Sequence, residues 1–318
     1  MNFEALMNDE DTHGIVAEEH WAKRGDIELC LWRKFSPTAQ AANPGRPVLV
    51  LVHGSSFSAR TTFDLSVPGH GEYSTMNIFA KCGYDVWTMD HEGYGRSSHT
   101  DGFSFVKDGV ADLQAAAPVI EAATGQSSFC FFGSSSGALR AGGFANVAPE
   151  RVAKLGLSAL VWTGEGSPTL IERAKRLDEW KSANRRIVDE AAYVRIFSRD
   201  VVGLTIPELP KTVAAAEMAN GGGSVPNGTY IDMCANLPLV DPTTIACPVL
   251  IYRGDHDGVA TDADVMAFFA ALPSKDKRLV MASGQAHNTT LGINRHRFWT
   301  LLDEFLMTPE RLDDHSTD

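Results

Sequence analysis

The residues Gly133-Ser134-Ser135-Ser136-Gly137 form a pattern in which one serine can act as a nucleophile. They directly follow an apolar run, residues 128–132, and directly precede an Ala-rich helical pattern, residues 138–147. On a sharp strand-to-helix turn the central hydroxyl projects above the sheet edge, and the flanking glycines let neighbouring backbone approach. The helix N-terminus favours developing negative charge there. We therefore predict that Ser135 is a nucleophile rather than part of a simple Gly/Ser turn.

A serine hydroxyl needs a general base, which is usually a histidine oriented by a carboxylate. Among the ten histidines, His287 has the clearest context, because it lies in a loop between a short apolar run and a helical pattern. Asp255 and Asp257 leave another apolar run and precede this histidine in the chain. We predict Asp257 as the acid, because the extra residues carry the chain past the strand edge before it turns. Asp255 and Glu165 are the alternatives, and an Asx-turn is the structural explanation for either aspartate.

Apolar runs alternate with helical patterns along most of the chain, as in βαβ units around a mainly parallel sheet. Continuous apolar strands are expected where helices cover both faces of such a sheet. Strands are predicted at residues 47–52, 84–89, 128–132, 247–252 and 278–281, and helices at 76–82, 138–147 and 291–306. Residues 27–32 are predicted to form an antiparallel strand at the start of the sheet. The predicted fold class is α/β.

Between residues 163 and 241 the regular strand spacing disappears and apolar residues recur at helical intervals. We predict an inserted helical cap over 163–241, with the α/β core formed by 1–162 and 242–318. Two ordinary crossover helices are the alternative, although the stretch is long for such a connection. Residues 220–224 are predicted to be a loop. Trp180 is a candidate for the substrate pocket, or for the internal packing of the cap together with Tyr193 and Phe197.

The cap is rich in charged residues, with a small excess of Lys and Arg between Glu172 and Asp200. Solvated helix faces with ion pairs are the simpler interpretation, and recognition of a carboxylate-bearing substrate is the alternative.

The composition excludes several functional classes. Lys and Arg number 28 against 40 Asp and Glu, a net charge of −12, which argues against a nucleic-acid partner. No apolar stretch is long enough to span a membrane and no export signal is visible, so we expect a cytoplasmic protein without a membrane partner. The five cysteines are scattered singly, which predicts neither disulfides nor a metal site. No cofactor is predicted, because no dinucleotide fingerprint, P-loop or HExxH motif occurs.

Four motifs together resemble those of the α/β-hydrolase-fold superfamily. They are LVHGSS at 51–56, DHEGYGRS at 90–97, the pentapeptide at 133–137, and the segment 254–257 followed by His287. The resemblance covers the chain from about Leu29 to Leu306 and includes the order Ser, Asp, His. It implies an α/β-hydrolase fold, with a mainly parallel central sheet between helices, and a serine hydrolase with an inserted helical cap.

The resemblance also implies an oxyanion hole made of backbone N–H groups. One would come from Ser136 and the other from Ser55 or Ser56, with Ser55 favoured by its position after His-Gly. The Ser56 hydroxyl either reaches the pocket or stabilises a turn. His53 is expected to brace the loop, and Asp90 is expected to hydrogen-bond local backbone.

These predictions favour one reaction: hydrolysis of a small carboxylic ester through an acyl-enzyme, as in carboxylesterases. Amide or carbamate hydrolysis and carbon–carbon bond hydrolysis are the alternatives on the same fold. A catalytically silent protein that binds a small molecule is the alternative outside the enzymes. Epoxide hydrolases and haloalkane dehalogenases are disfavoured, since they resemble this fold but have Asp at the position that Ser135 occupies here. The expected partner is a small-molecule ester, and the sequence leaves open whether the chain forms a homo-oligomer.

Overall fold

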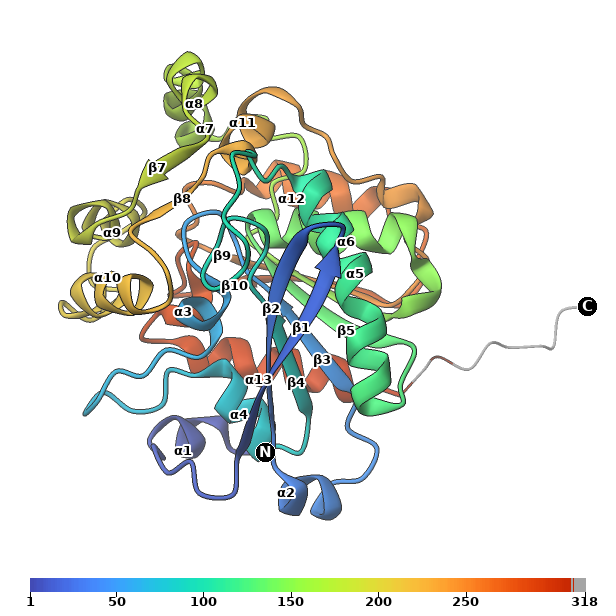
Figure 1. The fold of residues 1–318 in the computed structure, drawn as a ribbon. Coiled ribbons are helices and arrows are strands. Elements are labelled where there is room, and N and C mark those ends of the chain that lie inside the picture. The colour runs from blue at the N-terminus through green and yellow to red at the C-terminus, as the bar shows by residue number, and fades with distance from the viewer. Residues whose placement is uncertain (310, 312–318) are drawn as a thin grey trace, which may run out of the picture.

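The computed structural model describes residues 1–309 and 311. Eight strands form the central sheet: β1 (Val16–Arg24), β2 (Ile27–Phe35), β3 (Val48–Val52), β4 (Asp85–Met89), β5 (Phe129–Ser134), β6 (Val152–Ser158), β9 (Val249–Gly254) and β10 (Lys277–Ala282). Their order is β1-β2-β4-β3-β5-β6-β9-β10 (Figure 1). The pairs β1–β2 and β2–β4 are antiparallel and the remaining pairs are parallel. The predicted α/β fold class and the antiparallel strand after residue 26 are confirmed.

Helices cover both faces of the sheet. The core helices are α1 (Phe3–Met7), α2 (Pro37–Ala42), α3 (Ala59–Phe63), α4 (Thr75–Lys81), α5 (Val106–Thr124), α6 (Ser136–Val147), α12 (Asp262–Ala271) and α13 (Arg295–Met307), with 3₁₀ turns at Pro149–Arg151, Pro242–Thr244 and Thr289–Leu291. One apolar layer joins the sheet to α5, α6 and α12, and the other joins it to α4 and α13. In β3, valines point into the first layer and leucines into the second. Burial on both faces explains why the strands read as continuous apolar runs.

Several elements of the core were not predicted from the sequence, among them β6, α5 and α12. Strand β1 was not expected, because it is an edge strand with little burial; only Ala22 in it is buried. Its ladder with β2 closes through Gly25, which has a positive φ of 61°. The last helix begins at Arg295 rather than Leu291, because Thr289–Leu291 forms a 3₁₀ turn instead.

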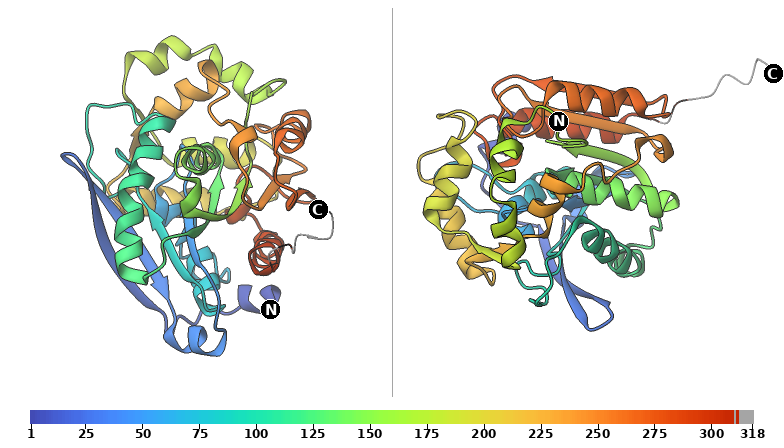
Figure 2. Two further views of the ribbon diagram at one scale, coloured as in Figure 1. Left: turned by 90° about the vertical axis from the view of Figure 1, so that its right-hand side faces the viewer. Right: turned by 90° about the horizontal axis from the view of Figure 1, so that it is seen from above.

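The segment between β6 and β9 contains α7 (Pro168–Ala174), α8 (Leu177–Ser182), β7 (Arg185–Ile187), α9 (Glu190–Ser198), α10 (Leu209–Ala219), β8 (Ser224–Pro226) and α11 (Gly228–Ala235). These elements gather at one side of the molecule (Figures 1 and 2). Strands β7 and β8 form a small antiparallel sheet that the helical pattern did not predict. Ser224, which was expected in a loop, begins β8.

The cap shares its apolar packing with the loops of the core. Tyr193 and Phe197 of α9 lie in one buried cluster with Phe57, Leu65 and Tyr94. The two cap aromatics therefore dock the cap onto the core rather than forming an independent cap interior. No helix within the described part of the chain is long and apolar enough to cross a lipid bilayer.

Candidate active site

The turn between β5 and α6 holds Ser135 in a conformation that side chains rarely adopt. Its φ is 57° and its ψ is −122°. A Cβ at Gly133 would lie 2.3 Å from the carbonyl oxygen of Gly137, and one at Gly137 would lie 2.1 Å from that of Val52. Only glycine fits at these two positions, so the pentapeptide allows the turn to close. Ser135 is half-buried, whereas the residues on either side of it are buried.

Ser135, His287 and Asp257 are joined by two hydrogen bonds. Ser135 Oγ lies 2.9 Å from His287 Nε2, and His287 Nδ1 lies 2.8 Å from Asp257 Oδ1. An ionised carboxylate can only accept, so Nδ1 carries the proton that it donates to Asp257. Nε2 is then the acceptor for the Ser135 hydroxyl. The three residues come from the carboxyl ends of β5, β9 and β10, which the parallel sheet brings to one edge.

Asp257 is held as a buried carboxylate. Its Oδ1 also accepts the backbone N–H groups of Val259 and Ala260, at 2.8 and 3.0 Å. Burial alone would raise the pKa of Asp257, but the imidazole and the two N–H groups outweigh it and hold that pKa below its ordinary value. The ionised form is therefore present at neutral pH to orient the imidazole and to stabilise an imidazolium.

The two alternative acids lie elsewhere. Asp255 is exposed, and its carboxylate accepts the N–H groups of Gly284 and Gln285 at 3.1 and 3.2 Å. It therefore ties the loop after β9 to the loop that carries His287. Glu165 is exposed in the segment after β6, where its backbone N–H donates to Thr163 and its carbonyl oxygen accepts from Thr261.

The predicted oxyanion residues lie in two segments beside the nucleophile, Ser55 and Ser56 in the loop after β3 and Ser136 directly after Ser135. A Cβ at Gly54 would lie 3.4 Å from Ser135 Cβ, so the loop after β3 runs directly beside Ser135. Ser55 Oγ donates to Ser136 Oγ at 2.8 Å. Ser136 is the first residue of α6, and a first-turn N–H has no acceptor within its own helix. Ser56 instead directs its hydroxyl to the cap, 3.2 Å from the hydroxyl of Tyr230.

His53 and Asp90 stabilise loops. The fully buried His53 has Nδ1 2.8 Å from the carbonyl oxygen of Gly54, and its Nε2 accepts the N–H of His91 at 3.2 Å. Asp90 accepts the backbone N–H groups of Ala59 and Arg96 at 2.8 and 3.0 Å. Both arrangements tie the segment after β3 to the segment after β4, and both lie outside the Ser135–His287–Asp257 chain.

One cavity lies between the core and the cap at Ser135, and a larger one lies beside it among the elements of the cap. The catalytic cavity, about 40 Å³, is lined by Ser135, His287, the loop after β3 and several cap residues. The outer cavity, about 760 Å³, lies against α7, α8, β7 and α9. The residues that line both are Ser56, Arg173, Ile196, Arg199 and Tyr230. A molecule that fills the outer cavity thus meets side chains that also border the nucleophile.

Trp180 lies in the wall of the outer cavity. Its ring meets that of Tyr230 edge-on at 5.5 Å, and its Nε1 donates to the carbonyl oxygen of Arg173 at 3.3 Å. The side chain is 7% exposed. It does not line the catalytic cavity, so the structure places it behind Tyr230 and away from Ser135.

Tyr230 was not among the residues predicted for the site from the sequence. Its ring lies between two guanidinium groups, with Arg173 at 3.7 Å and Arg186 at 3.6 Å from the centroid. Burial would raise the pKa of Tyr230, but these cations and the contact with Ser56 lower it to about 7. The sequence did show an excess of basic residues in this part of the cap, but not which of them face the cavity.

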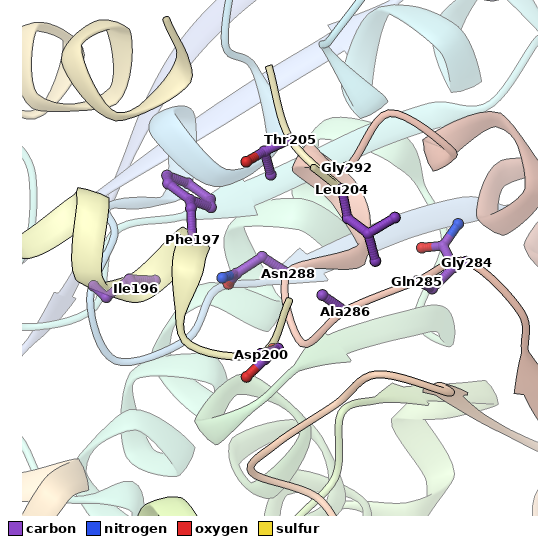
Figure 3. A pocket seen from close by; sticks show the side chains of 10 residues that line it. All are labelled: Ile196, Phe197, Asp200, Leu204, Thr205, Gly284, Gln285, Ala286, Asn288 and Gly292. Atoms are coloured by element: carbon purple, nitrogen blue, oxygen red, sulfur yellow. The ribbon is translucent and has the colours of Figure 1, made fainter. Parts of the chain in front are cut away.

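Asp200 is a second residue that the sequence did not assign to the site. Its Oδ2 accepts the backbone N–H of His287 at 2.9 Å, and its carboxylate also pairs with Arg199. Figure 3 shows Asp200 beside Ala286 and Asn288, on either side of the histidine in the chain. The cap thus contacts the loop of the predicted base directly.

Comparisons with known proteins give the family. No curated protein matches the chain. Among solved structures, the thioesterase domain from the curacin biosynthetic pathway is 20% identical, with a TM-score of 0.62, over 92% of this chain and 100% of that one. The hydrolase of 2-hydroxy-6-oxo-6-phenylhexa-2,4-dienoate from Rhodococcus sp. strain RHA1 is 14% identical, with a TM-score of 0.68 and the same coverage. E-2-(acetamidomethylene)succinate hydrolase is 16% identical, with a TM-score of 0.64 and again the same coverage.

At these identities the solved structures show the fold alone. The family profile described as alpha/beta hydrolase fold matches residues 47–291, which include the turn at Ser135, Asp257 and His287. This match spans most of the chain and both halves of the core. The chain therefore belongs to the alpha/beta hydrolase fold family.

Proposed function

We propose that the protein is a serine hydrolase that cleaves a small carboxylic ester through an acyl-enzyme. The observation that carries the proposal is the hydrogen-bonded chain from Ser135 through His287 to Asp257, at the edge of a cavity under the cap. Ester cleavage is favoured over amide cleavage because an alkoxide leaves more readily than an amine. The structural neighbours include a thioesterase domain and a carbon–carbon bond hydrolase, so the fold itself does not decide between these reactions.

In the first step His287 Nε2 accepts the proton of Ser135 as Oγ attacks the ester carbonyl carbon. The negative charge on the carbonyl oxygen is stabilised by the N–H groups of Ser55 and Ser136. His287 then donates the proton to the leaving alcohol, and the acyl group stays on Oγ. In the second step His287 activates a water molecule, which releases the carboxylic acid and restores Ser135. Asp257 stabilises the imidazolium in both steps.

The proposal is tested with para-nitrophenyl esters of increasing acyl length and a fluorophosphonate label, on the wild type and Ser135→Ala in parallel. We expect the wild type to turn over short esters and to be labelled, and Ser135→Ala to lose both. If the wild type were labelled but turned over no ester, the proposal of ester hydrolysis would be given up in favour of amide or carbon–carbon bond hydrolysis. Absence of both labelling and turnover in a folded wild type would refute the hydrolase and favour a binding protein.

A further inference from the structure

Six arginines line the two cavities, and four of them have no carboxylate partner. Arg176 pairs with Glu179 and Arg199 with Asp200. The structure shows no carboxylate of the described residues within 4.0 Å of the other four, which are Arg173, Arg185, Arg186 and Arg195. The protein as a whole carries a net charge of −12, so this concentration of positive charge is local to the cap. These arginines face the two cavities, where we expect a substrate to bind.

Arg173 differs from Arg185 and Arg186, which line only the outer cavity. Arg185 and Arg186 donate to neutral acceptors, namely Ser224, Gly93, Pro226, Asn227, Ser55 and Ser56. Arg173 stacks on Tyr230, and within the described chain its guanidinium has no hydrogen-bond acceptor. Stacking fixes the plane of the guanidinium while leaving its N–H groups available.

The catalytic cavity has the same sign of charge. Arg173 and Arg199 line it together with His287, and no Asp or Glu among the described residues does. Burial lowers the pKa of Arg173, and the nearby Arg186 and Arg199 lower it further. Arg173 is half-buried and has no counter-ion among the described residues, which is unfavourable for a cation, so an anion bound here would relieve that cost. The same positive charge lowers the pKa of the neighbouring Tyr230.

We propose that Arg173 binds a carboxylate of the substrate, so that the physiological substrate is an ester with a negative charge away from the scissile bond. This inference rests on the proposed ester hydrolysis for its reaction, but the binding site stands on its own geometry. The planar guanidinium offers two parallel N–H groups, which match the two oxygens of a carboxylate. Arg173 lines both cavities, so a carboxylate held there leaves the rest of the substrate free to reach Ser135.

The test uses two pairs of esters that differ only in the charged group. On the acyl side, the mono-para-nitrophenyl ester of glutarate is compared with its isostere in which an isopropyl group replaces the carboxylate. On the alcohol side, para-acetoxybenzoate is compared with para-isopropylphenyl acetate. We expect kcat/KM to favour the charged ester by at least about tenfold in one pair, as for a charge-assisted hydrogen bond. That pair also tells on which side of the ester the carboxylate lies.

Arg173→Met is the test variant and Arg195→Met is the matched control. Arg195 has an exposed side chain, lines only the outer cavity and has no ion pair with any residue that the structure describes. We expect Arg173→Met to abolish the preference for the charged ester and Arg195→Met to retain it. If both variants lost the preference for the charged ester equally, that preference would come from the overall positive charge of the cap. This result would overturn the carboxylate site at Arg173. Equal rates for both members of each pair in the wild type would overturn it as well.

Binding without catalysis separates this inference from the proposed function. Calorimetric titration of Ser135→Ala with glutarate, glutaramide and inorganic phosphate needs no turnover and no folded Arg173 variant. Binding of glutarate in preference to the other two supports a carboxylate site even if every ester is inert. Stronger binding of phosphate, or equal binding of glutarate and glutaramide, would overturn it.

Discussion

Asp200, at the end of α9 in the cap, accepts the backbone N–H of His287 at 2.9 Å and pairs with its own neighbour Arg199. The side chain of Asp200 is only 2% exposed, so water does not readily replace these contacts. The cap therefore does more than cover the cavity, since one of its carboxylates positions the loop of the predicted base.

Loss of this contact should disturb the position of His287. We expect Asp200→Ala to lower kcat about tenfold or more, with a smaller change in KM, because a buried N–H loses a charged acceptor. Asp200→Asn keeps an acceptor oxygen and should recover most of kcat. Steady-state kinetics on a neutral short-chain ester measures both values.

Asp189→Ala is the matched control for this variant. Asp189 is exposed and caps the N-terminus of α9 through the N–H of Ala192 at 2.8 Å. It should leave kcat within about twofold. If Asp200→Asn were as slow as Asp200→Ala, the ion pair with Arg199 rather than the hydrogen bond would be the important contact.

Substitution of Asp257 should lower kcat far more than substitution of Asp255. Asp257→Asn removes the carboxylate that fixes the imidazole tautomer and should lower kcat by about 10⁴-fold. Asp255→Asn weakens only the tie between two loops, so kcat should stay within about threefold while the melting temperature falls by about a few degrees. Kinetics and thermal unfolding of the two variants, side by side, make the comparison. A large loss of kcat in Asp255→Asn alone would exchange their roles.

Glu217 makes the docking of the cap depend on pH. In α10, its Oε1 accepts the N–H and the hydroxyl of Ser58 in the core, at 2.6 and 2.9 Å. Burial raises the pKa of Glu217 from 4.5 to about 7, despite these hydrogen bonds. The folded protein thus holds a proton that the unfolded chain has lost, and stability from this group falls as the pH rises from 4.5 to about 7.

Glu217→Gln keeps an acceptor for Ser58 but cannot ionise. We expect its melting temperature, relative to the wild type, to rise between pH 4.5 and about 7 and then to level off. Glu190→Gln, at an exposed position of α9, serves as the control and should show no such trend. A difference between Glu217→Gln and the wild type that did not change with pH would contradict the raised pKa.

The fold and the predicted catalytic residues Ser135, Asp257 and His287 could be predicted from local features of the sequence. Strands β3, β5 and β9 are buried on both faces, so they appear as uninterrupted apolar runs. The turn at Ser135 needs glycines at fixed positions, and that need leaves a short pattern. Because parallel strands end at one edge, the order of Ser135, Asp257 and His287 along the chain was enough to predict that they meet.

The charged part of the site could not be predicted in the same way. Pairs such as Arg176 with Glu179 follow helical spacing, and the sequence interpretation as solvated faces describes them correctly. Arg173, Arg186 and Tyr230 come from α7, β7 and α11, and their stacking depends on how the cap folds back on itself. No short pattern encodes such a contact. Strand β7, which presents Arg186, has only three residues and was not predicted.

Above neutral pH, the phenolate form of Tyr230 should compete with a substrate carboxylate for the positive charge of the arginines. The groups that face it are the guanidiniums of Arg173, Arg186 and Arg199 and the hydroxyl of Ser56, and together they lower its pKa to about 7 despite burial. A phenolate neutralises part of the positive charge, so carboxylate binding must favour the protonated phenol and raise its pKa. We therefore expect KM for the charged ester to rise as the pH increases from about 7 to about 9, by up to about tenfold per pH unit.

Tyr230→Phe should remove this rise, because Phe cannot ionise and keeps the ring between the two guanidiniums. The neutral isostere of the same ester is the internal control, and its KM should show no such rise in the wild type. Ultraviolet difference spectroscopy of the wild type and Tyr230→Phe gives an independent titration of the phenol. A rise in KM that persisted in Tyr230→Phe would assign the titration to a group other than this phenol.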